Sequence, residues 1–523
     1  MLTFTRNKAL YFVFSILLVL IIALPVLFVV FKTIQFPFLF PEDALNLIIS
    51  GRILNLLGKS ILLAFLVSLI TSLISLPLAY TFANFSFPLK RTFFILILIP
   101  FFIPPYIYAI SWIDLLGDSG LLQSLNVSIY GFWGSVFVLT GWLFPLSFFF
   151  FMSSVRINIQ LEEAAKLIKS KLHFFFKITF PVILPGILAG MVLSFILAVT
   201  NFCVPGALRL NVYTYEIFIQ FGAFFNHIQA IFLSFPFFLL SVFFILFFIK
   251  KYGGQTGKSE QKRELTNLKN LSAGQKYVFY ILTGFLIVVI LILPLITLLL
   301  DSGNLCVLVS TISDNLVEIW NSVFYNLTSA IILTAAGFYL AFFRRSIKMS
   351  LPQTLMDIII LLIITIPGIV WGILLIKYNQ IKTFSSLLSN PFAAVILSNM
   401  RYLPVSYFIC VAGLSRLPEK YLEAARLTAQ GKMTTFWKIL LPLNKNSILG
   451  SLIIVFVLCF GELDSAIMVY PPGFETMPLR IFSLLHYGAN EMVSALSLIQ
   501  VLIILVFIVS GYKWIKKIAF YYA

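Results

Sequence analysis

Charged residues are scarce in this chain. Asp, Glu, Lys and Arg make up 11% of its 523 residues, apolar residues make up 61%, and the mean hydropathy is +1.04. A soluble globule of this size needs more polar surface than this composition supplies, so the solvent of the chain must be lipid. Strict alternation of apolar and polar residues is missing from its apolar runs, which excludes the strands of a membrane β-barrel.

Cysteine and histidine are also rare, with four and three residues. The cysteines lie far apart without CxxC spacing, so they indicate small buried apolar side chains and exclude a disulfide framework. The histidines are equally scattered and form no metal constellation. We find no catalytic triad and no carboxylate pair for hydrolysis, so we expect neither an enzyme nor a cofactor. The cysteines and histidines of the chain are Cys203, Cys306, Cys410, Cys459, His173, His227 and His486.

Long apolar runs dominate what is present. Twelve runs of about 20 residues, enough to cross a bilayer core, predict an all-α polytopic membrane protein with about 12 transmembrane helices. The first run has twice the length of a signal-peptide core and no small-residue cleavage site, so we expect it to be a retained anchor. The runs fall near residues 10–32, 60–83, 92–113, 130–153, 182–204, 229–249, 277–300, 323–343, 354–376, 391–415, 447–470 and 493–512.

The net charge of +17 follows the predicted topology. Of the 36 Lys and Arg residues, 28 fall on the side that includes the N-terminus, 7 fall on the other side, and Arg401 lies within a run. The positive-inside rule then predicts that both termini are cytoplasmic. The basic excess is therefore a topology signal, with contact to anionic lipid a secondary role, and it does not indicate nucleic acid.

The chain repeats itself on either side of a polar stretch at 250–276. Pro145 corresponds to Pro404 at an offset of 259 residues, and Pro181 corresponds to Pro442 at an offset of 261. Six runs per copy give two parallel six-helix repeats related by an axis along the membrane normal, with a central path between them. We expect a first domain at 1–252, a cytoplasmic linker at 253–276 and a second domain at 277–523.

A polar motif occurs once in each copy, between the fourth and fifth runs and between the tenth and eleventh. The first contains Glu163-Ala164-Ala165 and leads to Pro181; the second contains Glu423-Ala424-Ala425 and leads to Pro442. Small alanines let another protein approach closely, and a carboxylate can pair with a basic residue there. An ordinary amphipathic interfacial helix is the alternative reading. Both segments resemble the EAA loop of binding-protein-dependent ABC importer permeases.

This resemblance implies the type I (MetI-like) permease fold in a bacterial inner membrane. It implies two copies of a cytoplasmic ABC ATPase docked on the two loops, and an extracytoplasmic binding protein that delivers substrate. Residues 461–489, which include Pro471-Pro472-Gly473, are similar to ferric iron permeases and also to thiamine and phosphonate permeases. The rival is an ion-coupled secondary transporter, which has no use for paired loops. A third class, a membrane-embedded enzyme, would need a cluster of catalytic residues, which we do not find in the sequence.

Polar residues near the end of the eleventh run are the candidate path residues. Charge at membrane depth is costly, so Glu462 and Asp464 must face a cavity or a partner. The offset that relates the two motif prolines also pairs Glu462 with Asn201, and we expect all three polar residues to line the translocation path. A structural hydrogen bond at a helix break is the alternative. Arg401 either neutralises one of the two acids or snorkels to the interface.

One further segment imitates a phosphate-binding loop. Residues 253–259 read Gly-Gly-Gln-Thr-Gly-Lys-Ser, but Tyr252 stands where that motif requires glycine, and no strand precedes it. We therefore expect ATP to be hydrolysed by a separate subunit.

Overall fold

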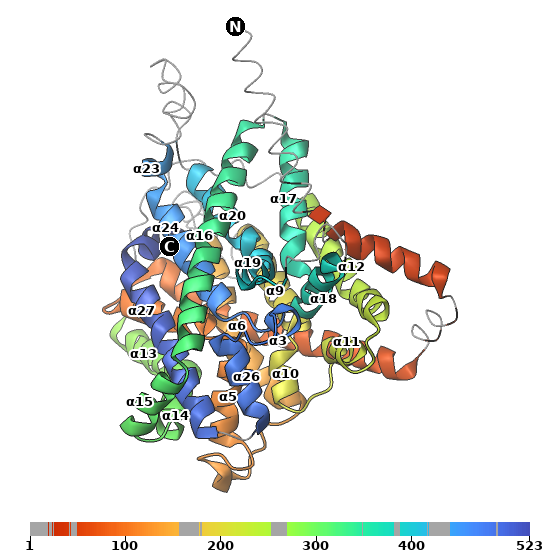
Figure 1. Cartoon of the computed structure of the whole chain (residues 1–523). Coiled ribbons are helices and arrows are strands. Elements are labelled where there is room, and N and C mark those ends of the chain that lie inside the picture. Colours follow the sequence, from red (N-terminus) through yellow and green to blue (C-terminus); the bar gives the residue numbers. More distant parts are fainter. Residues whose placement is uncertain are drawn as a thin grey trace.

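The computed structural model describes residues 26–40, 50–155, 180–252, 269–347, 349–380, 388–415, 440–487 and 490–522, with a few single positions between them. Helices make up nearly all of this part (Figure 1). Its strands are β1 (Phe85–Ser86) and β2 (Lys269–Asn270), which pair in parallel with Phe85 opposite Lys269. The end of the expected linker therefore lies beside the first copy.

The helices of the first copy that are used below are α3 (Gly51–Asn84), α4 (Lys90–Phe102), α5 (Pro105–Leu116), α6 (Phe132–Val155), α9 (Phe180–Thr200), α10 (Cys203–Ala207), α11 (Tyr213–Gly222) and α12 (His227–Tyr252). An apolar helix over Val26–Leu39 precedes them.

The helices of the second copy are α13 (Ala273–Ile287), α14 (Leu293–Asp301), α15 (Leu305–Asp314), α16 (Leu316–Ser346), α17 (Ser350–Thr365), α18 (Gly368–Asn379), α19 (Pro391–Asn399), α20 (Leu403–Ser415), α23 (Leu441–Leu443), α24 (Lys445–Phe460), α25 (Ala466–Val469), α26 (Met477–Tyr487) and α27 (Asn490–Tyr522). A π-helix, η3 (Val288–Ile292), joins α13 to α14, and a 3-10 helix, η5 (Met400–Tyr402), joins α19 to α20.

Ten of the twelve expected spans coincide with helices long and apolar enough to cross a bilayer. Eight are single stretches and two are bent pairs, counted over the described residues. The eleventh expected span overlaps a shorter apolar helix, α24, and the end of the first overlaps another at Val26–Leu39. Most of the first expected span, 10–32, lies outside the described residues. The all-α, polytopic fold class is thus confirmed. The second copy begins its first helix at Ala273, slightly before the expected boundary at 277.

Two of the expected spans, 92–113 and 354–376, are sharply bent. The angle between α4 and α5 is 96°, and the angle between α17 and α18 is 100°. Proline disfavours helical backbone in the residue before it, and Ile103 and Ile366 are extended at the breaks before Pro104 and Pro367. The two breaks lie at corresponding positions of the two copies, so the bend belongs to the repeat.

Helix packing is also repeated. In the first copy α3, α6 and α9 contact one another, and in the second copy α16, α20 and α24 do the same. A hydrogen bond is repeated as well. The backbone N–H of Tyr213 donates to Ser60 Oγ at 2.9 Å, and that of Met477 donates to Ser322 Oγ at 2.7 Å. Ser60 and Ser322 are counterparts in the repeat. Each bond fastens the first residue of a helix, α11 or α26, to the corresponding long helix of its own copy, α3 or α16.

The two copies meet through α5, which packs on α14 and α27, and through α12, which packs on α17 and α18. In Figure 1, α16 runs from the lower part of the molecule to its upper edge, with α17 and α20 near its upper half and α14 and α26 below. Large apolar side chains remain exposed on the outer helices, among them Phe285, Val506 and Val509. Such a surface suits a lipid environment.

Candidate translocation site

The helices of the fifth and eleventh spans both end just before a polar residue, Asn201 in the first copy and Glu462 in the second. Helix α9 ends at Thr200 and α24 ends at Phe460, and each is followed by a short helix, α10 or α25. The side chain of Asn201 accepts the backbone N–H of Val204 at 3.0 Å, and that of Glu462 accepts the N–H of Ser465 at 3.0 Å. Asn201 and Glu462 therefore do the same local work in the two copies, which is the bond at a helix break that the sequence offered as the alternative.

Glu462 does more than Asn201, because it also meets Arg401. Arg401 Nη1 lies 3.2 Å from Glu462 Oε1 and 3.5 Å from Asp464 Oδ2. Arg401 is 7% exposed and Glu462 is 3% exposed, so the charges lie away from the surface. Of the two expected roles for Arg401, the structure shows ion pairing and not snorkelling.

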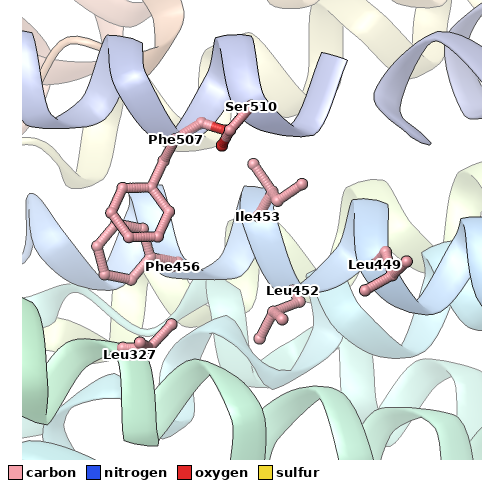
Figure 2. A pocket seen from close by; sticks show the side chains of 7 residues that line it. All are labelled: Leu327, Leu449, Leu452, Ile453, Phe456, Phe507 and Ser510. Carbon is pink, nitrogen blue, oxygen red and sulfur yellow. The ribbon is translucent and has the colours of Figure 1, made fainter. Parts of the chain in front are cut away.

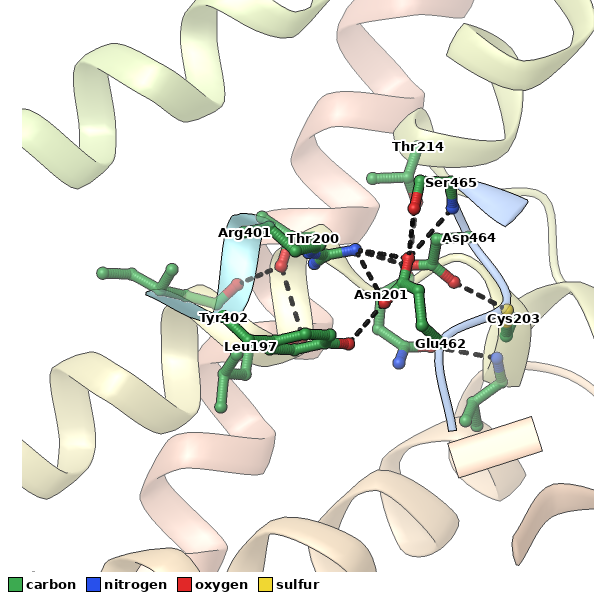
Figure 3. A network of polar contacts seen from close by, with 12 residues as sticks. Leu197, Thr200, Asn201, Cys203, Thr214, Arg401, Tyr402, Glu462, Asp464 and Ser465 are labelled. Atoms are coloured by element: carbon green, nitrogen blue, oxygen red, sulfur yellow. Dashed lines mark hydrogen bonds and ion pairs between the residues drawn. The ribbon is translucent and has the colours of Figure 1, made fainter. Parts of the chain in front are cut away.

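Two neutral groups complete the coordination of the Glu462 carboxylate. Tyr402 donates its hydroxyl to Oε2, while the Ser465 hydroxyl donates to Oε1 at 2.8 Å. In Figure 3 these donors converge on Glu462 from η5 and from the turn before α25. Hydrogen bonds from several donors offset the cost of burying the carboxylate of Glu462.

Glycine at position 368 makes room for the cluster at the first residue of α18. A Cβ built there would lie 2.0 Å from Arg401 Nη1 and 2.3 Å from Asp464 Cβ. Any larger residue would have to displace either the guanidinium or the carboxylate. The bend between α17 and α18 thus brings backbone directly against the ion pair.

Asp464 also reaches the first copy. The Cys203 thiol donates to Asp464 Oδ1 at 3.0 Å, and the two residues are 261 positions apart, the offset of the repeat in this segment. A residue that touches its own counterpart lies at the pseudo-twofold axis. The acidic cluster therefore sits where the two copies meet, which is where a path between them must run.

Charge is unbalanced at this place, with two carboxylates facing one guanidinium. A cation that leaves water loses favourable hydration. Because the carboxylates here outnumber the guanidinium, they would stabilise a second cation between the copies electrostatically. The described residues contain no group of three or more His, Cys, Asp or Glu side chains placed to hold a metal ion. The site can attract a passing cation but lacks the ligands of a resident metal centre.

An apolar pocket lies apart from these charges, between α16, α24 and α27 (Figure 2). Its lining offers one hydroxyl, that of Ser510, among aliphatic and aromatic side chains, and this chemistry suits hydrocarbon and not an ion. The lining residues are Leu327, Leu449, Leu452, Ile453, Phe456, Phe507 and Ser510.

The predicted coupling motifs fall mostly outside the described residues, which contain none of Glu163, Ala164, Ala165, Glu423, Ala424 and Ala425. The two prolines that end the motifs are described. Pro181 is the second residue of α9 and Pro442 the second of α23, and both are exposed. Proline suits the first helical turn, where its missing N–H has no partner to lose.

Other sequence expectations are placed as follows. His227 begins α12, His173 lies outside the described residues, and so does the Gly-rich segment 253–259. The four cysteines are free thiols, and three of them are buried as expected, whereas Cys306 is exposed.

Sequence reasoning missed Tyr402, Ser465, Gly368 and Cys203 as members of the cluster. Ser465 follows Glu462 at capping distance, which is a local signal. Cys203 could have been found from the repeat offset, because it corresponds to Asp464. Nothing local marks Tyr402 or Gly368.

Comparison with known proteins gives one family match. Residues 334–518 match the family described as binding-protein-dependent transport system inner membrane component. This segment runs from α16 into α27 and includes the whole second motif, Arg401, Glu462 and Asp464.

Three curated relatives show what the chain is similar to. It is 22% identical over 512 residues to a ferric transport system permease protein of Actinobacillus pleuropneumoniae, covering 91% of this chain and 73% of that one. It is 22% identical over 475 residues to an Fe(3+)-transport system permease protein of Haemophilus influenzae, covering 89% and 90%. It is 29% identical over 107 residues to a spermidine/putrescine transport system permease protein of Escherichia coli, covering 20% and 40%.

Proposed function

We propose that this chain, which is the permease component of a binding-protein-dependent ABC importer in the inner membrane, carries ferric iron past the acidic cluster between its two copies. The observation that carries the cargo class is the excess of negative charge at the axis, where the carboxylates of Glu462 and Asp464 face the single guanidinium of Arg401. A cation crossing there replaces lost hydration by carboxylate contact, whereas an anion is repelled. The two ferric permeases that match nine tenths of the chain support iron among the cations.

The two copies, 1–252 and 277–523, act as a pseudo-dimer with the segment 253–276 as a cytoplasmic linker. The repeated bonds at Ser60 and Ser322 and the repeated bends support this division. Alternating access then consists of one copy moving against the other, with the contact between Cys203 and Asp464 near the axis of that motion.

ATP is hydrolysed by two copies of a separate cytoplasmic ATPase. They dock at the loops around Glu163 and Glu423, and a binding protein delivers cargo to the opposite, extracytoplasmic face. Support comes from the paired motifs and from the lysine and arginine bias, which places both loops and both termini on the cytoplasmic side. Asn201, Glu462, Asp464 and Arg401 line the path in this proposal.

Other cargoes are separated by charge. Phosphonate is an anion and disagrees with the acidic cluster, whereas thiamine is a cation and agrees with it. A secondary transporter would also use buried ionisable groups, but the family match of residues 334–518 favours ATP-driven import. Thiamine is therefore the second candidate.

The test is uptake of radioactive Fe3+ by proteoliposomes that contain the permease and its ATPase, with cargo presented on the binding protein. We expect Glu462→Gln and Asp464→Asn each to lower uptake about tenfold, which corresponds to about 1.4 kcal/mol. Glu475→Gln is the matched control, because Glu475 is a half-exposed acid outside the cluster. Unchanged uptake in both cluster variants would overturn the path assignment, and uptake of thiamine in place of iron would overturn the cargo.

A further inference from the structure

A second ionic cluster, partly buried, joins α20 to α16 and α17. Arg344 Nε donates to Asp357 Oδ1 at 2.8 Å, and its Nη2 donates to Asp357 Oδ2 at 2.8 Å, so the pair is bidentate. The Tyr407 hydroxyl donates to Asp357 Oδ1 at 2.6 Å. The three residues come from α16, α17 and α20, so the Asp357 carboxylate links three helices.

The first copy fills the equivalent place with three phenylalanines. Phe82 and Phe148 are in edge contact with ring centroids 5.1 Å apart, and Phe94 lies 6.0 Å from Phe148. The local offsets of the repeat, 262 residues at Ser60 and Ser322, 259 at Pro145 and Pro404, and 263 at Pro104 and Pro367, make Phe82, Phe148 and Phe94 the counterparts of Arg344, Tyr407 and Asp357 in that order. Aromatic packing therefore fills this place in the first copy, and an ion pair links the corresponding three helices in the second copy.

Arg345, beside Arg344, binds the end of α20. Its guanidinium donates to the carbonyl oxygen of Leu414 and, at 2.6 Å, to that of Leu417. Leu414 lies in the last turn of α20 and Leu417 lies just beyond it, so the guanidinium holds both the end of the helix and the residues that follow. A cation at this position also interacts favourably with the helix dipole. Leu417 lies six residues before Glu423 of the second coupling motif.

Two glycines make this end of the bundle tight. A Cβ on Gly337 of α16 would lie 2.1 Å from Ser406 Oγ of α20, and a Cβ on Gly413 of α20 would lie 2.2 Å from Ser447 Oγ of α24. The chain leaves α20 for the motif and returns in α24, so both ends of the motif segment are packed against each other. Close-packed helices transmit displacement without absorbing it.

The other end of α20 reaches the axis. Residues 400–402 form η5 directly before α20 and include Arg401 and Tyr402, both of which contact Glu462. Thirteen helical residues span about 20 Å, so one short rigid element connects the polar cluster at Leu414 with the acidic cluster at the axis.

We propose that Arg344, Arg345, Asp357 and Tyr407 form a mount for the second coupling loop, so that movement of the docked ATPase reaches Arg401 through α20. These are positioning residues, since none of them touches the cargo. This inference rests on the proposed ATPase docking at Glu423. It adds the structural route by which movement of the ATPase reaches the cluster at the axis.

The test measures coupling and docking separately in the complete complex. We expect Arg345→Gln to keep the ATPase bound during purification and to keep basal ATP hydrolysis. Transport per ATP, and stimulation of hydrolysis by the loaded binding protein, fall at least about fivefold, the low end of measured coupling factors. Arg209→Gln is the matched control, because Arg209 is an exposed arginine paired with Asp118 away from α20.

A rescue variant uses the first copy as its template. The triple change Arg344→Phe, Asp357→Phe and Tyr407→Phe rebuilds the aromatic arrangement. We expect it to retain more coupling than Arg344→Gln, which leaves the partly buried Asp357 carboxylate without its counter-ion. If Arg345→Gln does not accumulate, Arg345→Lys keeps the charge without the fork and carries the same expectation.

Transport per ATP at the wild-type level in these Arg345 variants would overturn the mount. Loss of ATPase binding in parallel with loss of transport would also overturn it, because the residues would then serve docking alone. Absence of the ATPase from the unmodified complex would instead refute the docking on which the inference rests.

Discussion

The thiol of Cys203 lies 3.0 Å from Oδ1 of Asp464, and these two residues occupy corresponding positions in the two copies of the repeat. Contacts between counterparts can form only near the axis that relates the copies. The bond therefore marks the place where the copies close on each other, and it makes their separation measurable.

The first prediction uses the native thiol at this place. Asp464→Cys sets a second thiol opposite Cys203. We expect a mild oxidant to form a disulfide that blocks the uptake remaining in the reduced variant, with recovery to that level on reduction. Asp464→Ser and the Cys203→Ser, Asp464→Cys double variant serve as controls, since neither has the thiol pair. Uptake that continues with the disulfide formed would show that the copies do not separate here.

A second prediction concerns the ion pair itself. Arg401→Gln leaves Glu462 and Asp464 without their buried counter-ion, which costs about 3–5 kcal/mol. Thermal unfolding of the purified protein in detergent should show a lowered midpoint, and adding Glu462→Gln should return part of the loss. Arg209→Gln at an exposed pair should cost less than about 1 kcal/mol. Equal midpoints for Arg401→Gln and Arg209→Gln would contradict the description of the cluster.

Glycine 368 gives a third prediction. Because a Cβ would lie 2.0 Å from Arg401 Nη1, Gly368→Ala should destabilise the protein by about 1–3 kcal/mol, as overpacking does elsewhere. Gly274→Ala is the comparison, since nothing lies within 4 Å of a Cβ at that helical position and alanine favours helix. The same unfolding assay applies, and a neutral Gly368→Ala would mean that the guanidinium has room to move aside.

The duplication supplies a fourth prediction. Ser60→Ala and Ser322→Ala each leave one backbone N–H without its buried acceptor, that of Tyr213 or Met477, at a cost of about 1–3 kcal/mol. We expect the two losses of unfolding free energy to be similar and to add in the double variant, because the sites lie in different copies. A loss confined to one copy would show that the two bonds are not equivalent.

Much of this architecture was predictable from sequence. The apolar runs gave ten spans and two shorter apolar helices, and the repeat offset paired Glu462 with Asn201 before their common capping bond was seen. The bends at Pro104 and Pro367 were missed because each run is apolar through its break, and hydropathy does not report direction. Helix α24 ends at Phe460, well before the expected residue 470, since Gly461 and Glu462 turn the chain into a separate short helix.

The cluster was harder to predict than the spans. The sequence marks Arg401 as unusual, but ion pairing and snorkelling both fit its position, so the sequence alone left these two roles open. Tyr402 and Gly368 join the acids only through the bend at Pro367 and the packing of α20, which are tertiary relations. The resemblance to importer permeases was confirmed by the family match, whereas the coupling residues and path residues stay predictions.

The energy source tests the whole account most directly. The assay uses proteoliposomes that contain the permease and its ATPase and are supplied with loaded binding protein. They should accumulate radioactive Fe3+ only when ATP is present on the side of the membrane where the ATPase is bound. Collapse of the proton gradient by an ionophore should leave the rate of uptake unchanged. Uptake without ATP that stops when the proton gradient is collapsed would contradict the account and identify an ion-coupled transporter.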